Sequence, residues 1–122
     1  MKHVTQTESQ WATFIEIGPR AFPAWDDPSA FQERLDNFTM LPGDTVESVL
    51  AAYAAVADRT DELVRTLPDL DLAHPLPTAP WFEEDVTRTA RRTFLHIVAE
   101  TAQHAGHADI VREALDGTRS MG

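Results

Sequence analysis

The stretch that decides the fold is Phe94–Gly117, FLHIVAETAQHAGHADIVREALDG, near the end of the chain. It contains no proline, and its only glycine before the last residue is Gly106, which favours one long helix. This helix is expected to begin between Thr87 and Thr89 and to run to Leu115. At about 100° of rotation per residue, its metal-capable side chains fall within an arc of roughly 80°. They are His96, Glu100, His104 and His107.

The rise of a helix limits which of these side chains can bind the same ion. Residues four apart are about 6 Å apart along the axis and can converge, whereas His96 and His104 are about 12 Å apart. Bonds of about 2.0–2.2 Å to zinc cannot span the longer distance. The allowed pairs are His96 with Glu100, Glu100 with His104, and His104 with His107. A third ligand must come from another element, and the histidines that remain are His3 and His74.

An interpretation without a metal competes with this one. Glu/His pairs four residues apart are common on helices, where they are usually surface or hydrogen-bonded polar groups. A row of such groups on an otherwise apolar helix is costly to bury without a partner, and a cation is one partner that satisfies it. His74, in a proline-rich segment, is expected to be an exposed loop residue. His3 lies at a chain end, where helices fray.

Composition narrows the classes of function. The chain has 122 residues, which suits a single domain over residues 1–122 that removes roughly 65 % of its unfolded surface from water. The absence of cysteine excludes disulfides, thiolate metal sites and a cysteine nucleophile. The net charge of -10 argues against nucleic acids and anionic membranes as partners. Because no apolar run approaches the roughly 20 residues that span a bilayer, we expect a cytoplasmic protein.

Two further segments, 2–17 and 45–67, have apolar residues three and four apart, which predicts two more long helices. Asp44, with Glu47 three residues later, provides a capping-box-like start for the second of them, and Pro68 ends it. The predicted fold class is therefore all-α.

Two proline-rich segments separate these helices. Residues 19–43 are expected to form a packed crossover, in which Asp27 caps a short helix that begins at Pro28 and ends near Asn37. Residues 68–85 are expected to be irregular. No strand is expected anywhere in the chain.

Two parts of the sequence resemble a known family. The run LHIVAETAQHAGHADIVREALDG, with its E-x-x-x-H-x-G-H-x-D motif, resembles the last helix of the DinB-like superfamily, in particular its mycothiol-dependent maleylpyruvate isomerase-like branch. The run KHVTQTESQW resembles the second helix of that branch. The resemblance covers residues 2–117 and implies a DinB-like four-helix bundle with a long crossover between its second and third helices. Residues 19–43 would supply that crossover.

The resemblance also implies a site and a chemistry. It assigns three metal ligands to His3, Glu100 and His104, with zinc as the expected ion and nickel as the alternative. His107 and Asp109 match the H-x-D part of the motif, where His107 is expected to bond or orient a ligand or the substrate. The implied activity is that of a metal-dependent transferase or isomerase, in which a low-molecular-weight thiol such as mycothiol attacks a small-molecule electrophile.

The first helix of that family has no counterpart, since Met1 lies inside the second. Three main helices would leave an apolar groove open, which predicts either a homodimer whose partner covers the groove or a translation start further upstream. The rival interpretation is a non-enzymatic dimeric helical module with a structural or vestigial metal site.

Overall fold

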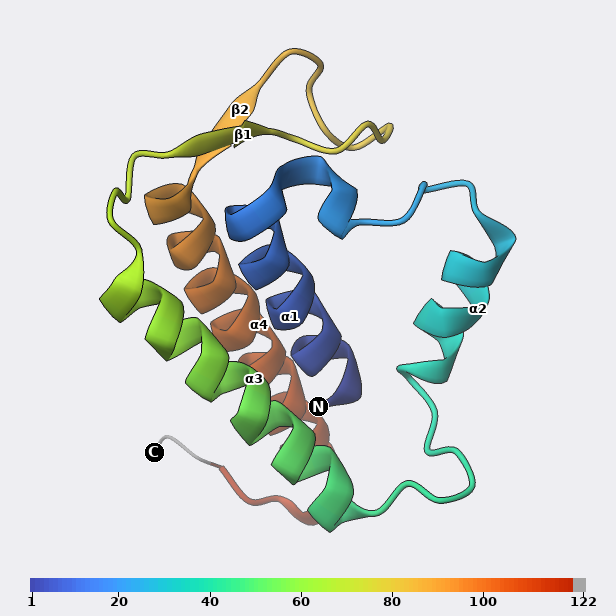
Figure 1. Cartoon of the computed structure of the whole chain (residues 1–122). Coiled ribbons are helices and arrows are strands. Elements are labelled where there is room, and N and C mark those ends of the chain that lie inside the picture. The colour runs from blue at the N-terminus through green and yellow to red at the C-terminus, as the bar shows by residue number, and fades with distance from the viewer. Residues whose placement is uncertain (120–122) are drawn as a thin grey trace.

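Three long helices form the body of the protein. A computed structural model describes residues 1–119, and its main elements are α1 (Lys2–Ile17), α3 (Val46–Thr66) and α4 (Ala90–Asp116). α1 packs against both α3 and α4 and so lies at the centre of the fold (Figure 1). The predicted all-α class is confirmed. Among the described residues, no helix is long and apolar enough to cross a membrane.

The crossover between α1 and α3 contains two short elements, of which only the second, a helix that begins at Pro28, was predicted. The 3-10 helix η1 (Gly18–Ala21) follows α1 directly, and α2 (Pro28–Asp36) lies to one side of the long helices (Figure 1). The predicted cap of α2 is confirmed, because the Asp27 side chain accepts a hydrogen bond from the Ser29 N–H.

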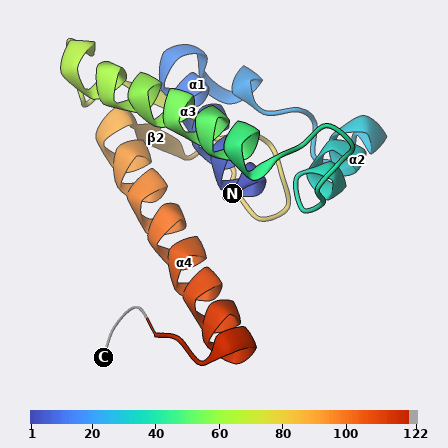
Figure 2. The same cartoon turned by 90° about the horizontal axis from the view of Figure 1, so that it is seen from below.

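The ends of α4 also agree with the prediction. The Thr89 hydroxyl accepts a hydrogen bond from the Arg92 N–H, which makes Thr89 the N-cap. At the other end Gly117 takes the left-handed conformation, with φ 73°, that glycine adopts without a steric penalty. The C-terminal half of α4 extends beyond α1 and α3 (Figure 2).

The predicted cap of α3 is wrong by one residue. Thr45 is the N-cap, and its hydroxyl accepts from the Ser48 N–H while the Ser48 hydroxyl accepts from the Thr45 N–H. Asp44 is instead engaged by the Lys2 ammonium and by the Leu41 N–H. The Asp44 side chain is therefore occupied by a contact with α1, and the neighbouring Thr45 caps α3.

The expectation of no strand is also wrong. β1 (Ala73–Pro75) pairs with β2 (Thr87–Thr89) in an antiparallel sheet, with His74 opposite Arg88. Strands this short and bordered by prolines do not show the alternation that marks a strand in sequence. The pair of strands lies across the C-terminal end of α1 and the N-terminal end of α4 (Figure 1).

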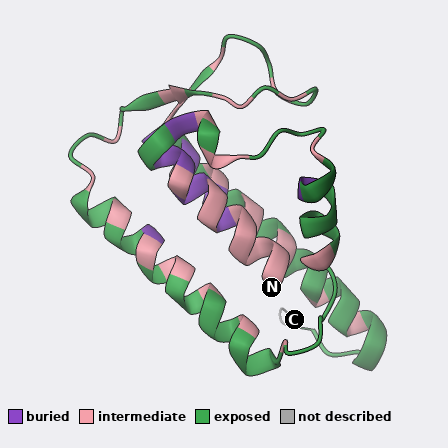
Figure 3. Ribbon diagram, turned by 45° about the vertical axis from the view of Figure 1, so that its right-hand side comes forward, coloured by how far each residue is buried: buried purple, intermediate pink, exposed green. Residues whose placement is uncertain are grey.

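The buried core is small and follows α1. Its centre is made by Trp11, Phe14 and Ile97, and the buried segments cluster along α1 (Figure 3). Several large apolar side chains on α3 and α4 are exposed to solvent, and Leu115 is 82 % exposed. The first half of α4 is thus held firmly against α1, which fixes the relative position of the two helices that carry the candidate site.

Candidate functional site

Glu100 lies between two histidines on α4. One carboxylate oxygen, Oε1, is 3.4 Å from His96 Nε2, and the other, Oε2, is 3.4 Å from His104 Nε2. Because each histidine is four residues from Glu100, the helix brings both imidazoles to the same carboxylate. Two of the three pairs that helical rise allows are therefore formed.

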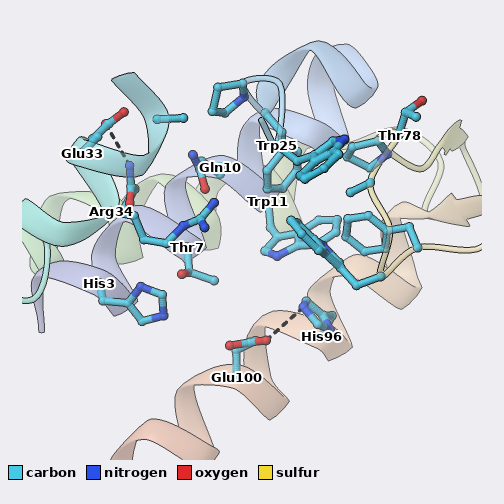
Figure 4. Close-up of a pocket in the computed structure, with 18 residues that line it drawn as sticks. His3, Thr7, Gln10, Trp11, Trp25, Glu33, Arg34, Thr78, His96 and Glu100 are labelled. Atoms are coloured by element: carbon cyan, nitrogen blue, oxygen red, sulfur yellow. Dashed lines mark hydrogen bonds and ion pairs between the residues drawn. The ribbon is translucent and has the colours of Figure 1, made fainter. Parts of the chain in front are cut away.

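His3 reaches this cluster from α1. Its ring meets the His104 ring edge-to-face with centroids 4.9 Å apart, and it stacks on Phe38 at 4.6 Å. Figure 4 shows the His3 ring and the Glu100 carboxylate bordering one cavity from two different helices. The structure thus brings together His3, Glu100 and His104, the residues to which the resemblance assigns metal binding. Their role as ligands stays a prediction.

The start of α1, where His3 lies, is held in place by its neighbour Lys2. The Lys2 Nζ donates three hydrogen bonds, to Asp44 Oδ2 at 2.7 Å and to the carbonyl oxygens of Asp36 and Thr39 at 2.9 Å. An ammonium has three donors, so all of them are used. This tie to the crossover opposes the fraying expected at a chain end.

Burial lowers the pKa of two histidines in the cluster. For His3 desolvation is the main cause of the lowered pKa, repulsion from His104 adds to it, and Glu100 opposes it. For His96 desolvation again comes first, followed by repulsion from Arg88. Both imidazoles are therefore favoured in the neutral form near pH 7, in which one ring nitrogen has a free lone pair.

The chemistry of the donors suits a divalent cation. Two donors each about 2.1 Å from a tetrahedral ion lie roughly 3.4 Å apart, and both Glu100–histidine distances are 3.4 Å. As the side chains lie, however, no group of three histidine or acidic residues within residues 1–119 could hold a metal ion. The donor types and pairwise spacings fit, and a site would require a third side chain, that of His3, to turn towards the pair.

The other predicted site residues lie further along α4. His107 is exposed, and its ring centroid is 6.2 Å from that of His104. Asp109 is half-buried. The structure does not test a supporting role for either residue, and both roles stay predictions.

The expectation for His74 is wrong. His74 lies in β1, half-buried, with its ring Nε2 3.2 Å from the Ile15 carbonyl oxygen. Its ring also packs under Gly18, where a Cβ would lie 2.9 Å from His74 Nδ1. Pairing of β1 with β2 brings this histidine against the end of α1, so its contacts are with the fold and not with the cluster around Glu100.

A cavity of about 370 Å³ opens beside the cluster. His3, His96 and Glu100 border it, and all three tryptophans of the chain line it. Its aromatic lining consists of Trp11, Phe22, Trp25, Trp81 and Phe82. No pattern in the sequence predicted this cavity. The one available signal was the abundance of aromatic residues in the two proline-rich segments.

Comparison with known proteins gives one match. The sequence profile of a family described as mycothiol-S-transferase matches residues 1–117. No curated protein and no solved structure matches the chain. The match spans the three long helices and every residue of the cluster, and it confirms the resemblance to the DinB-like superfamily.

Proposed function

This chain belongs to the DinB-like mycothiol-S-transferase family, and we propose that it joins mycothiol, through its sulfur, to a small electrophile at the cluster between α1 and α4 (S-transfer). The observation that carries the proposal is the position of Glu100 between His96 and His104, with His3 beside them from the other helix. A cavity large enough for a small molecule borders three of these residues.

We further propose that His3, Glu100 and His104 hold a divalent cation, zinc or nickel. Two imidazoles and a carboxylate are a ligand set found in catalytic zinc sites, which keep a position open for water or substrate. A cation bound there favours the deprotonated, nucleophilic form of a thiol that reaches it. The proposal is supported by the 3.4 Å spacing of Glu100 and His104 and by the lowered pKa of His3.

His96 is the group placed to receive a proton. Its Nε2 is 3.4 Å from Glu100 Oε1, and its ring is 4.8 Å from the Trp11 ring, measured between centroids. His96 therefore lies where the cluster meets the aromatic lining of the cavity. Its lowered pKa leaves it neutral and able to accept the thiol proton. The sulfur then forms a bond to the electrophilic carbon, and the leaving group departs with the electron pair of the bond that breaks.

The test is a mycothiol-consumption assay with protein purified without a histidine tag and reconstituted with zinc or nickel. Wild type is expected to accelerate the reaction, while Glu100→Ala and His104→Ala lose the acceleration. Glu113→Ala, on the same helix but paired with Arg119 in solvent, is the matched control and is expected to keep it. Equal rates for wild type, Glu100→Ala and His104→Ala would contradict the proposal. A well-folded protein without activity would favour the rival non-enzymatic module.

We also infer that the protein is a homodimer in the cytoplasm. Large apolar side chains are exposed along α3 and α4, at Val46, Leu50, Val64, Leu95, Val98, Ile110, Val111 and Leu115. Large apolar side chains that are exposed in such numbers on two helices favour an interface, and a second copy would cover them isologously. A reducing compartment keeps a thiol cosubstrate in its reactive form.

A further inference from the structure

We propose that the electrophile used at this site carries an uncharged aromatic group, which binds in the cavity beside Glu100. The inference rests on the proposed S-transfer and names the class of its second substrate. It is drawn from the ring contacts, the charges and the volume of the cavity.

Aromatic rings form a continuous row from the cluster to the surface. The row starts at His96, whose ring is 4.8 Å from that of Trp11, and Trp11 is 6.2 Å from Phe82. Phe82 is in turn 6.2 Å from Trp81, and Trp81 is 6.4 Å from Trp25, all between ring centroids. These pairs are edge-to-face or tilted, the geometries that aromatic rings prefer. A bound ring would extend this row.

The outer end of the row is not needed for the core. Trp25 is 48 % exposed and Trp81 is 61 % exposed, and they come from two separate loops that both line the cavity. Tryptophan presents a large apolar area together with a polar tip, which suits a site that a ligand enters from water. Two exposed tryptophans that line one cavity therefore mark its entrance.

The charges around the cavity suit a neutral substrate. Its lining contains one guanidinium, that of Arg34, and two carboxylates, those of Glu33 and Glu100. The Arg88 guanidinium is close by but lies over the Trp11 ring at 4.8 Å, outside the cavity lining, with its Nη1 buried. Apart from Glu100, which is a proposed metal ligand, the lining holds one carboxylate and one guanidinium, so this part of the cavity has no net charge and suits a neutral ligand.

The volume sets the size of the group. At about 370 Å³ the cavity lies near the lower end of the roughly 300–1,000 Å³ typical of small-molecule sites. Such a space suits one or two aromatic rings with a short reactive arm. The arm would point towards His96 and Glu100, where the thiol is activated.

Two α-bromoketones provide a matched pair of probes. Phenacyl bromide and bromoacetone share the reacting carbon and leaving group, and they differ in a phenyl group against a methyl group. With either one the mycothiol sulfur forms a C–S bond to the CH₂ carbon as the C–Br bond breaks, bromide leaves with the electron pair, and the thiol proton is released to the buffer. Each enzymatic kcat/KM is divided by the rate constant of the same reaction without enzyme.

Wild type is expected to favour phenacyl bromide over bromoacetone by at least about tenfold in this corrected ratio, which corresponds to one aromatic contact of about 1.4 kcal/mol. The double variant Trp25→Ala/Trp81→Ala is expected to bring the ratio close to one by slowing only the aromatic substrate. Phe31→Ala removes another exposed aromatic side chain, on α2 and outside the cavity lining, and is expected to leave the ratio unchanged.

Calorimetric titration with acetophenone separates this inference from the proposed function, because acetophenone has the ring and ketone but no leaving group. Saturable binding of acetophenone to wild type that is lost in the double variant would support the aromatic site. If neither bromoketone reacted in that case, only the proposed S-transfer would be refuted. Equal corrected rates for both bromoketones in wild type and in the double variant would overturn the aromatic inference while leaving S-transfer in place. Absence of both acetophenone binding and phenacyl preference would also overturn it.

Discussion

Lys2 Nζ lies 2.7 Å from Asp44 Oδ2 and so joins the first turn of α1 to the residue that precedes the cap of α3. Both side chains are largely shielded from solvent, with exposed fractions of 19 % and 26 %. His3 is the next residue after Lys2, which makes this contact the anchor of the only predicted ligand that does not come from α4. The position of His3 in the candidate site therefore depends on the hydrogen bonds between Lys2 and the segment that joins α1 to α3.

Removal of this anchor is expected to weaken metal binding. Lys2→Met keeps the length of the side chain but loses the three hydrogen bonds, so the start of α1 should fray and His3 should be displaced. We expect a metal Kd about tenfold weaker, or about 1.4 kcal/mol, measured by competition with a chromophoric chelator. Arg65→Met, which breaks an exposed pair with Glu62, is the control. Equal affinity for wild type and Lys2→Met would contradict the role assigned to Lys2.

The metal-free protein is expected to lose stability as the pH falls below 6.5. The pKa values of His3 and His96 are lowered from 6.5, mainly by burial. Between 6.5 and the lower pKa that these histidines have in the folded protein, the unfolded chain binds more protons than the folded chain. Acid therefore favours unfolding in this range. The contribution of the two neutral imidazoles to stability is fully present only above pH 6.5. The variant His3→Gln/His96→Gln should therefore show a smaller fall in Tm from about pH 7.5 to about pH 5.5, measured with a chelator present. Parallel Tm curves for the two proteins would be inconsistent with neutral buried imidazoles.

Gly18 and Gly106 should respond in opposite ways to alanine. Gly18 has φ 82°, and a Cβ there would lie 2.9 Å from His74 Nδ1, so Gly18→Ala should lower the free energy of unfolding by about 1–3 kcal/mol. Gly106 is inside α4 with open space around it. Gly106→Ala should raise the free energy of unfolding by about 0.5–1 kcal/mol. Urea unfolding measures both, and a stabilised Gly18→Ala would show that the His74 contact is wrong.

Light scattering should give about twice the monomer mass of 13.6 kDa. A charge placed on the exposed apolar face of α4 should prevent association, because burial of an unpaired carboxylate is costly. Val98→Asp is the variant, since Val98 is 65 % exposed. Gln32→Asp adds the same charge on α2 and should remain dimeric. A wild type that is monomeric and unfolds cooperatively would refute the homodimer.

Features that depend on residues close together in the chain could be predicted from the sequence. The spacing of His96, Glu100 and His104 is set by one helix, so their proximity followed from helical geometry alone. The caps at Asp27 and Thr89 depend on backbone groups two and three residues away. Asp27 was predicted as a cap, and Thr89 was one of the two residues between which the start of α4 was expected.

Features that join distant segments could not be predicted in the same way. Asp44 had the right spacing to begin α3, but Lys2 engages it from α1 and Thr45 became the cap. Trp25 and Trp81 meet only because two irregular loops fold over the same end of the helices. Such loops have no sequence periodicity, so the aromatic cavity that they form could not be predicted from the sequence.

The central claim is that His3, Glu100 and His104 form a metal site that serves S-transfer. Elemental analysis of untagged protein, exposed to zinc or nickel and then dialysed, tests it most directly. Wild type should retain stoichiometric metal, His3→Ala should retain less, and Glu100→Ala and His104→Ala should retain almost none, while Glu113→Ala matches wild type. Metal content that is the same in wild type, Glu100→Ala and His104→Ala would contradict the claim.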